Sequence, residues 1–194
     1  MAEDVAAGGA VGEQLTERLF LAVALSDDVR HGLAAFLDDE AGRLPGKPVP
    51  PTNWHLTLRF LGTTEQHQRD LVVAFLDDHA TTEPFVLGFD GLGGFARPAR
   101  ATVLWLGVGR GSDPAAALAA VCEEAAQAAG FDPEDRPFHP HVTLSRIRPR
   151  KDVSTLVDSV PRFPLTQTVD RITLYRSILG RDGARYEVAD EVEL

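Results

Sequence analysis

Large apolar and polar residues alternate along two stretches of the chain, residues 54–61 and residues 142–147. A period of two is typical of a half-buried β-strand, because successive side chains point to opposite faces of a sheet. Strict alternation in the first stretch gives an apolar face of Leu56, Leu58 and Phe60 and a polar face of His55, Thr57 and Arg59. The first stretch thus predicts a strand with His55 and Thr57 on one face. The second stretch, together with His141 directly before it, predicts a strand with His141 and Thr143 on one face.

Shorter apolar runs predict the other strands, and they cover residues 18–25, 85–89, 102–108, 165–179 and 186–194. A glycine-rich segment, residues 91–94, is predicted to be part of a turn, and Arg181-Asp182-Gly183 is predicted to be a hairpin turn. Apolar positions three and four residues apart predict the helices. These begin after caps at Ser26, at Thr63 or Thr64 and at Ser112 or Asp113, with a short fourth helix over residues 152–160.

The predicted order is β-α-β-α-β-β-α-β-α-β-β, in which each half contains a strand, a helix, a His-x-Thr strand and a second helix. This order predicts an α+β fold made of two similar lobes. Residues 1–16 have little apolar surface to bury and are predicted to be a flexible tail, which leaves residues 17–194 as a single bilobal domain.

The composition, with 44% hydrophobic and 25% charged residues among 194, is that of a soluble globular protein. No run approaches the ~18 apolar residues of a membrane span, and the N-terminal stretch lacks the basic start of a signal peptide. We therefore expect a cytoplasmic protein with no membrane partner. The single cysteine, Cys122, lies on the apolar face of a predicted helix and is expected to be buried.

The net charge of −10 argues against a general nucleic-acid coat protein. The charge is unevenly distributed, however. Between Arg136 and Lys151 there are five basic residues and no acidic one, and this basic island surrounds the second His-x-Thr. A short anionic substrate needs only such local positive potential.

Two histidines that face one cleft can act as general base and general acid, and two threonine hydroxyls can bind phosphate oxygens. This combination suits the opening of a cyclic phosphodiester, and it requires no metal or nucleotide cofactor. Arg59 extends the polar face and either lines the groove or is a solvated strand end. Strict alternation points Arg146 away from His141, so that Arg146 reaches the cleft only if the strand bulges or ends there.

The remaining histidines have simpler interpretations. His31, His67 and His79 lie on predicted helices beside charged residues and are expected to be solvated. His139 and His141 could form a metal-binding pair, but no third ligand has a suitable spacing, so no metal is expected.

The chain resembles the two-histidine (2H) phosphoesterase superfamily, and within it the RNA 2′,3′-cyclic phosphodiesterase (2′-5′ RNA ligase) family. The resemblance rests on both HXTX motifs, His55-Leu56-Thr57-Leu58 and His141-Val142-Thr143-Leu144, and on the segments 18–22, 103–108 and 174–177. It implies a bilobal α+β fold, with two antiparallel sheets flanking a central cleft and helices on the outside.

The resemblance also implies an activity: hydrolysis of RNA 2′,3′-cyclic phosphate ends to a 2′-phosphate without metal or cofactor, and a weak reverse 2′-5′ ligation. By position, His55 would be the proton donor and His141 the proton acceptor, whereas Thr57, Thr143 and Arg146 would bind the phosphate. We expect a monomer.

Other functions are compatible with the same motifs. The substrate could be a small cyclic nucleotide or an ADP-ribose cyclic phosphate, which the acidic composition mildly favours. A non-catalytic module that binds RNA ends is a further alternative, although binding alone would not require two titratable bases. A metallohydrolase built on His139 and His141 would lose its activity in a chelator.

Overall fold

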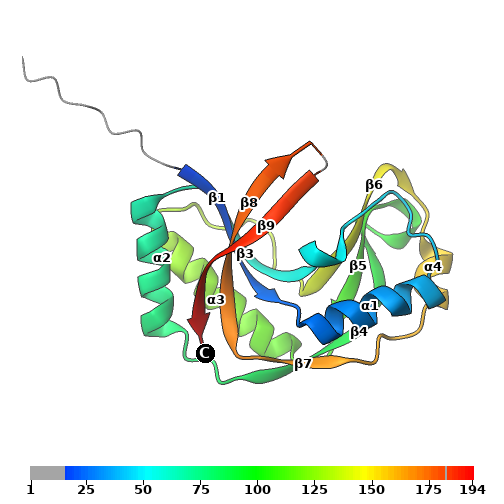
Figure 1. Ribbon diagram of the computed structural model, residues 1–194, viewed down its shortest axis with the longest axis horizontal. Coiled ribbons are helices and arrows are strands. Elements are labelled where there is room, and N and C mark those ends of the chain that lie inside the picture. Colours follow the sequence, from blue (N-terminus) through cyan, green and yellow to red (C-terminus); the bar gives the residue numbers. More distant parts are fainter. Residues whose placement is uncertain (1–15, 182) are drawn as a thin grey trace, which may run out of the picture.

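The computed structural model describes residues 16–181 and 183–194 of the chain, and it has the predicted α+β architecture (Figure 1). The helices of this part are α1 (Asp27–Glu40), α2 (Gln66–His79), α3 (Ser112–Ala128) and α4 (Ser154–Ser159). The strands are β1 (Thr16–Ala24), β2 (Lys47–Pro48), β3 (His55–Glu65), β4 (Phe85–Phe95), β5 (Ala101–Val108), β6 (His141–Lys151), β7 (Thr166–Val169), β8 (Arg171–Gly180) and β9 (Gly183–Glu193). None of the described helices is long and apolar enough to cross a membrane.

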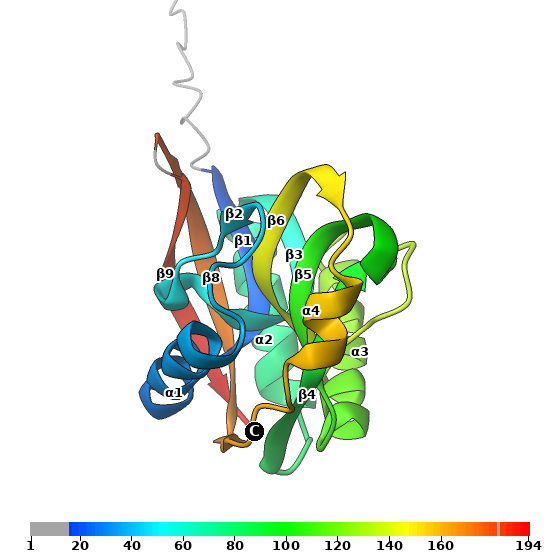
Figure 2. The ribbon, with the colours of Figure 1, turned by 90° about the vertical axis from the view of Figure 1, so that its right-hand side faces the viewer.

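The strands form two antiparallel halves that meet between the two motif strands. Their order is β7-β4-β5-β6-β3-β1-β8-β9, and β2 pairs with β6. The halves join where β3 pairs with β6, with Leu56 opposite Val142. Figure 2 shows the halves fanning out on either side of this junction. The bilobal arrangement predicted from the sequence is therefore confirmed.

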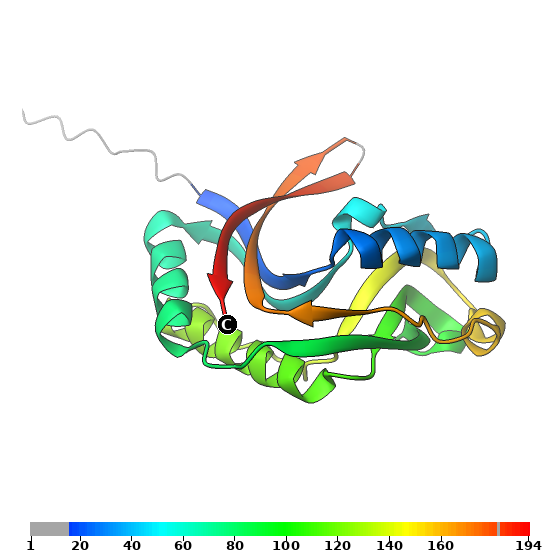
Figure 3. The ribbon, with the colours of Figure 1, turned by 60° about the horizontal axis from the view of Figure 1, so that its bottom comes forward.

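Helices α1 and α3 tie the halves together, because each packs on the half opposite to the strand that precedes it. Helix α1, which follows β1, begins at Ser26, whose hydroxyl accepts a hydrogen bond from the Val29 amide, as predicted. It places Phe36 against Phe163 in the segment before β7. Helix α3, which follows β5, packs on β3 and α2 in the opposite half. The helices thus lie outside the sheets (Figure 3), and Cys122, on the inward face of α3, is fully buried, as expected.

The second helix begins later than predicted. Neither Thr63 nor Thr64 caps it, because both continue β3 and pair with β1. The cap is Glu65, which forms a capping box with Gln68. Gly111, in the left-handed conformation, likewise precedes α3, so that Ser112 is its first residue and not its cap.

Two further boundaries differ from the sequence prediction. The segment predicted as one strand, residues 165–179, is divided at Asp170 into β7 and β8, which pair with β4 and β1 in different halves. Residues 1–15 of the predicted tail and Asp182 of the predicted hairpin turn lie outside the described residues, whereas Thr16 already belongs to β1.

The glycine-rich segment is not a turn, because β4 runs through it. Gly93 pairs with Trp105 of β5, and the indole ring fills the space beside the glycine. A Cβ atom on Gly93 would lie 2.2 Å from that ring, so this position accepts no side chain. The glycine serves close packing within a strand.

We therefore expect Gly93→Ala to destabilise the fold by about 1–3 kcal/mol, the usual cost of overpacking a core. The matched control is Gly91→Ala in the same strand, because a Cβ atom at Gly91 meets nothing within 4 Å. The free energy of unfolding in urea measures both. Equal effects of the two substitutions would contradict the packing role of Gly93.

Candidate active site

Each motif strand contains a β-bulge directly after its threonine. In the first, Ala22 of β1 is opposite Thr57, and the preceding residue, Leu21, is opposite Arg59. Between these two pairs β1 advances by one residue and β3 by two, so Leu58 is the extra residue. A bulge of this kind reverses which face the following side chains occupy.

The second motif strand has the same irregularity at the same place. Trp105 of β5 is opposite Thr143, and the preceding residue, Leu104, is opposite Ser145, so Leu144 is the extra residue. The first seven residues of β3 and β6 accordingly share one pattern of burial. The lobes are thus alike in detail as well as in outline.

The bulges correct two sequence predictions. Phe60, assigned to the apolar face, is 55% exposed, and Arg59, assigned to the polar face, is only 9% exposed. Arg146 occupies the place in β6 that Phe60 occupies in β3, so the bulge turns it toward the face of His141. Its positive charge contributes to the lowering of the pKa of both histidines, as expected of a neighbouring cation.

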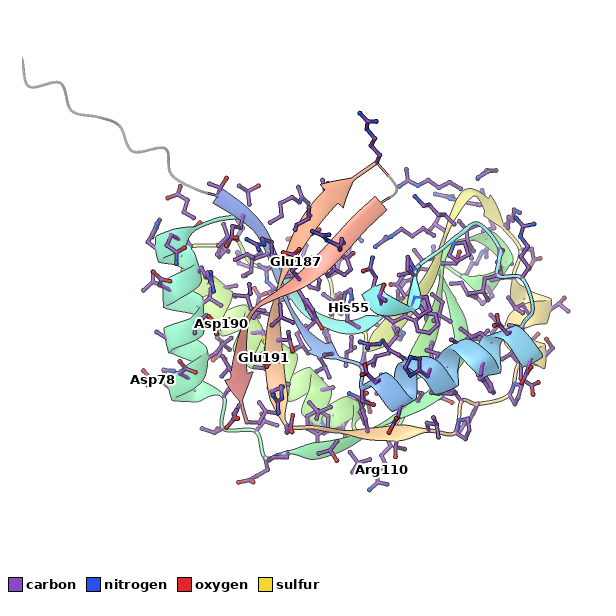
Figure 4. The ribbon with its side chains drawn as sticks, viewed as in Figure 1. His55, Asp78, Arg110, Glu187, Asp190 and Glu191 are labelled. Carbon is purple, nitrogen blue, oxygen red and sulfur yellow. The ribbon has the colours of Figure 1, made fainter. Side chains whose placement is uncertain are left out.

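The junction of the halves brings the four polar motif residues together. Leu56 and Val142 are opposite each other and fully buried, so their neighbours lie on the other face. One residue further in each direction, this antiparallel register sets Thr57 opposite His141 and His55 opposite Thr143. Figure 4 shows His55 between the two halves, at the start of β3.

Both imidazoles are held in the same way. Nδ1 of His55 lies 2.8 Å from the carbonyl oxygen of Asn53, and Nδ1 of His141 lies 2.7 Å from that of His139. A carbonyl oxygen only accepts, so Nδ1 carries the proton in each ring. Nε2 is therefore the nitrogen left to exchange protons with a substrate.

Aromatic rings surround the two imidazoles and remove water from them. Phe20, Tyr175 and Tyr186 pack around His55. Burial, with the charges of His141 and Arg146, lowers the pKa of His55 to about 4. The pKa of His141 is also lowered, by burial first and then by His139 and Arg146. The sequence alone did not predict which aromatic residues surround the two histidines.

A largely apolar cavity of about 720 Å³ opens beside His141, and its walls include Thr57, Phe60, Phe95 and Phe138. Its volume lies in the range of pockets that hold small organic molecules. Phe95 also packs edge-on against the His141 ring, with ring centroids 4.9 Å apart. The cavity thus joins aromatic surface to the two-histidine face.

Comparisons with known proteins agree with this geometry. The sequence profile of the 2′-5′ RNA ligase superfamily matches residues 24–181. The chain belongs to this superfamily. The RNA 2′,3′-cyclic phosphodiesterase of Aeropyrum pernix is 34% identical over 157 residues, 77% of this chain and 87% of that protein. The enzyme of the same name from Escherichia coli is 33% identical over 175 residues, 88% of this chain and 92% of that protein.

Solved structures of the superfamily have the same fold. Escherichia coli LigT in its apo form superposes with a TM-score of 0.74 at 30% identity, covering 92% of this chain and 98% of that one. LigT complexed with 3′-AMP superposes with a TM-score of 0.76 at 29% identity, covering 93% and 99%. The prediction that the chain is an enzyme of the 2H phosphoesterase superfamily is confirmed.

A buried arginine, Arg59, connects the first motif strand, β3, to the segment that precedes His141. Arg59 forms an ion pair with Glu123 of α3 and donates hydrogen bonds to the carbonyl oxygens of Phe60 and Asp132. Glu123 also accepts a hydrogen bond from the Glu134 amide, 3.1 Å away. Arg59 thus lines the cavity, one of the two alternatives that the sequence left open, but it is buried and paired and is not a solvated strand end. It holds β3, α3 and residues 132–134 in place.

The other histidines are accounted for by the structure. His31, His67 and His79 are exposed, as expected. The His139 and His141 ring centroids lie 6.0 Å apart. Within residues 16–181 and 183–194, no group of three or more His, Cys, Asp or Glu side chains could hold a metal ion.

Removal of the Arg59 side chain should destabilise the protein. We expect Arg59→Met to lower the free energy of unfolding by about 2–3 kcal/mol, because Glu123 and two carbonyl groups lose a partly buried partner. Arg171→Met is the matched control, because its ion pairs with Asp170 and Glu191 are exposed and contribute little to stability. Urea unfolding compares the two, and similar losses would show that Arg59 has no special structural role.

Proposed function

We propose that the protein hydrolyses the 2′,3′-cyclic phosphate at an RNA 3′ end to a 2′-phosphate by metal-independent acid–base catalysis. The observation that carries this proposal is the pair of identically anchored imidazoles, each with Nε2 free and each opposite the threonine of the other motif. The curated relatives named RNA 2′,3′-cyclic phosphodiesterase support the substrate class.

In the proposed reaction, Nε2 of His141 accepts a proton from water as the water oxygen bonds to phosphorus. The bond from phosphorus to the 3′-oxygen breaks, and Nε2 of His55 donates its proton to that oxygen. Thr57 and Thr143 donate hydrogen bonds to the non-bridging oxygens, and Arg146 stabilises the negative charge that develops on them. An RNA 5′-hydroxyl in place of water gives a 2′-5′ linkage, the weak ligation that we include in the proposal.

The electrostatics of the site indicate that the bound substrate promotes protonation of His55, the proposed acid. With its pKa near 4, His55 is neutral in the free site at neutral pH. A bound phosphodiester anion raises the pKa of a neighbouring imidazole, because an opposite charge favours the protonated form. Substrate binding therefore favours uptake from solvent of the proton that His55 later transfers.

The central experiment measures hydrolysis of a short RNA ending in a 2′,3′-cyclic phosphate, in excess EDTA. We expect the wild-type protein to give only the 2′-phosphate. His55→Ala and His141→Ala should each lower the rate by at least about 10²–10⁴-fold, the usual contribution of one acid or base. His67→Ala, which changes an exposed histidine, is the control. Activity that is lost in EDTA would favour a metallohydrolase. No turnover with or without EDTA would favour a small cyclic nucleotide or an ADP-ribose cyclic phosphate as the substrate, and the RNA-end binding module if these also are not hydrolysed.

The pH dependence of kcat/KM should reflect the lowered pKa values of the free site. Catalysis needs one neutral and one protonated imidazole, a state that is most populated between the two pKa values of the coupled pair. Both pKa values lie below 6.5. We therefore expect a bell-shaped profile with its maximum below pH 6.5 and a decline as the pH rises.

Arg146→Gln should shift this profile to higher pH as well as lower the rate, because it removes a positive charge that depresses both pKa values. Arg148→Gln, two residues further along β6, is the control for a general loss of charge. A profile of Arg146→Gln that superimposes on that of the wild type would show that Arg146 does not act on the histidines.

We also propose that residues 17–194 act as a single domain, as a monomer in the cytoplasm and without a cofactor. Size-exclusion chromatography with light scattering tests the oligomeric state.

A further inference from the structure

Two strongly basic hollows lie beside the site, on the far part of β6. The first, about 1010 Å³, is lined by Arg43, Lys47, Arg146, Arg148 and Lys151 together with small and apolar residues. The second, about 520 Å³, is lined by Arg146, Arg148 and Arg150 and by residues 102–103 of β5. Among the described residues, no carboxylate lines either hollow.

Five cations of these hollows, unlike seven arginines elsewhere, take part in no ion pair between described residues. Ion pairs within the described part of the chain involve Arg30, Arg59, Arg69, Arg162, Arg171, Arg176 and Arg185. None involves Arg43, Arg146, Arg148, Arg150 or Lys151. In a chain of net charge −10, with 29 acidic residues, these five cations together create a local positive potential that attracts anions.

The hollows are connected to the chemistry through Arg146. This residue lines both of them, and its charge also acts on His55 and His141. The apolar cavity beside His141 is distinct: it shares Thr102 with the second hollow and no residue with the first. The site therefore has an aromatic cavity suited to a base, adjoined by cationic hollows suited to phosphates.

We propose that the two hollows bind the phosphates of the RNA nucleotides that precede the terminal cyclic phosphate. This inference rests on the proposed function and deepens it: the substrate is an RNA strand of several nucleotides and not a mononucleotide. Arg43, Arg148, Arg150 and Lys151 are then positioning residues, which contact the strand away from the reacting phosphorus. Cationic side chains fit this partner because the phosphate backbone supplies most of the affinity of single strands for proteins.

The test compares two substrates and two matched variants. The substrates are a hexaribonucleotide that ends in a 2′,3′-cyclic phosphate and a nucleoside 2′,3′-cyclic monophosphate. Arg148→Gln/Lys151→Gln removes two charges from the hollows. Arg110→Gln is the control, since Arg110 is exposed, forms no ion pair with another described residue and lies beyond β4 and β7, far from His55 (Figure 4).

We expect the wild type to have a lower KM for the hexamer than for the monomer. The double variant should raise the hexamer KM about 10-fold and leave kcat almost unchanged. It should also reduce the dependence of log(kcat/KM) on log[salt] by about 0.7 per lost phosphate contact. Kinetics on the monomer, and all kinetics of Arg110→Gln, should stay within about twofold of the wild type.

Binding of the same hexamer ending in a 3′-phosphate, followed by fluorescence anisotropy, separates this inference from the proposed function because it needs no turnover. Weaker binding by the double variant, with binding by Arg110→Gln intact, supports the inference even if no hydrolysis is observed. Equal binding by all three proteins would overturn it, as would equal losses on hexamer and monomer, even if hydrolysis of the cyclic phosphate is confirmed.

Discussion

The site depends on the contact between β3 and β6, where Leu56 lies opposite Val142. Each half of the sheet supplies one imidazole and one hydroxyl, and neither half alone supplies an acid and a base. Because the register is antiparallel, the contact sets each histidine against the threonine of the other half. A slip of either strand by one residue would turn the histidine and the threonine of that strand to the buried face. The exchanged packing of α1 and α3 resists such a slip, since each helix leaves one half and packs on the other.

The same junction explains the electrostatics of the site. Aromatic rings from β1, β8 and β9 surround His55, and rings from β4 and β5 surround His141. These rings remove water, so that both imidazoles are kept neutral and Nε2 is left as a base. Arg146 adds a positive charge that further opposes their protonation. In the proposed reaction an anionic substrate offsets both effects at once, and protonation of His55 is therefore coupled to phosphate binding.

The sequence predicted the two motif strands better than it predicted the direction of the side chains that follow each motif. The two His-x-Thr strands, the Ser26 cap and burial of Cys122 follow from local periodicity and propensity. The bulges at Leu58 and Leu144 do not, because a leucine fits the buried face on either side of the irregularity. Arg59 and Phe60 therefore exchanged their predicted faces. The burial of Arg59 depends on Glu123, 64 positions away in the chain, and no local pattern contains that information.

Gly93 illustrates a different limit. Glycine pairs usually mark turns, and the competing reason for this one, the indole of Trp105, lies on the neighbouring strand. The net charge is an equally incomplete guide. Seven arginines elsewhere pair with acidic residues, whereas Arg43, Arg146, Arg148, Arg150 and Lys151 form no ion pair with a described residue. Because affinity depends on the local potential, an anionic protein can thus present a cationic path to an RNA strand. The rest of the surface repels strands that are not aligned with this path.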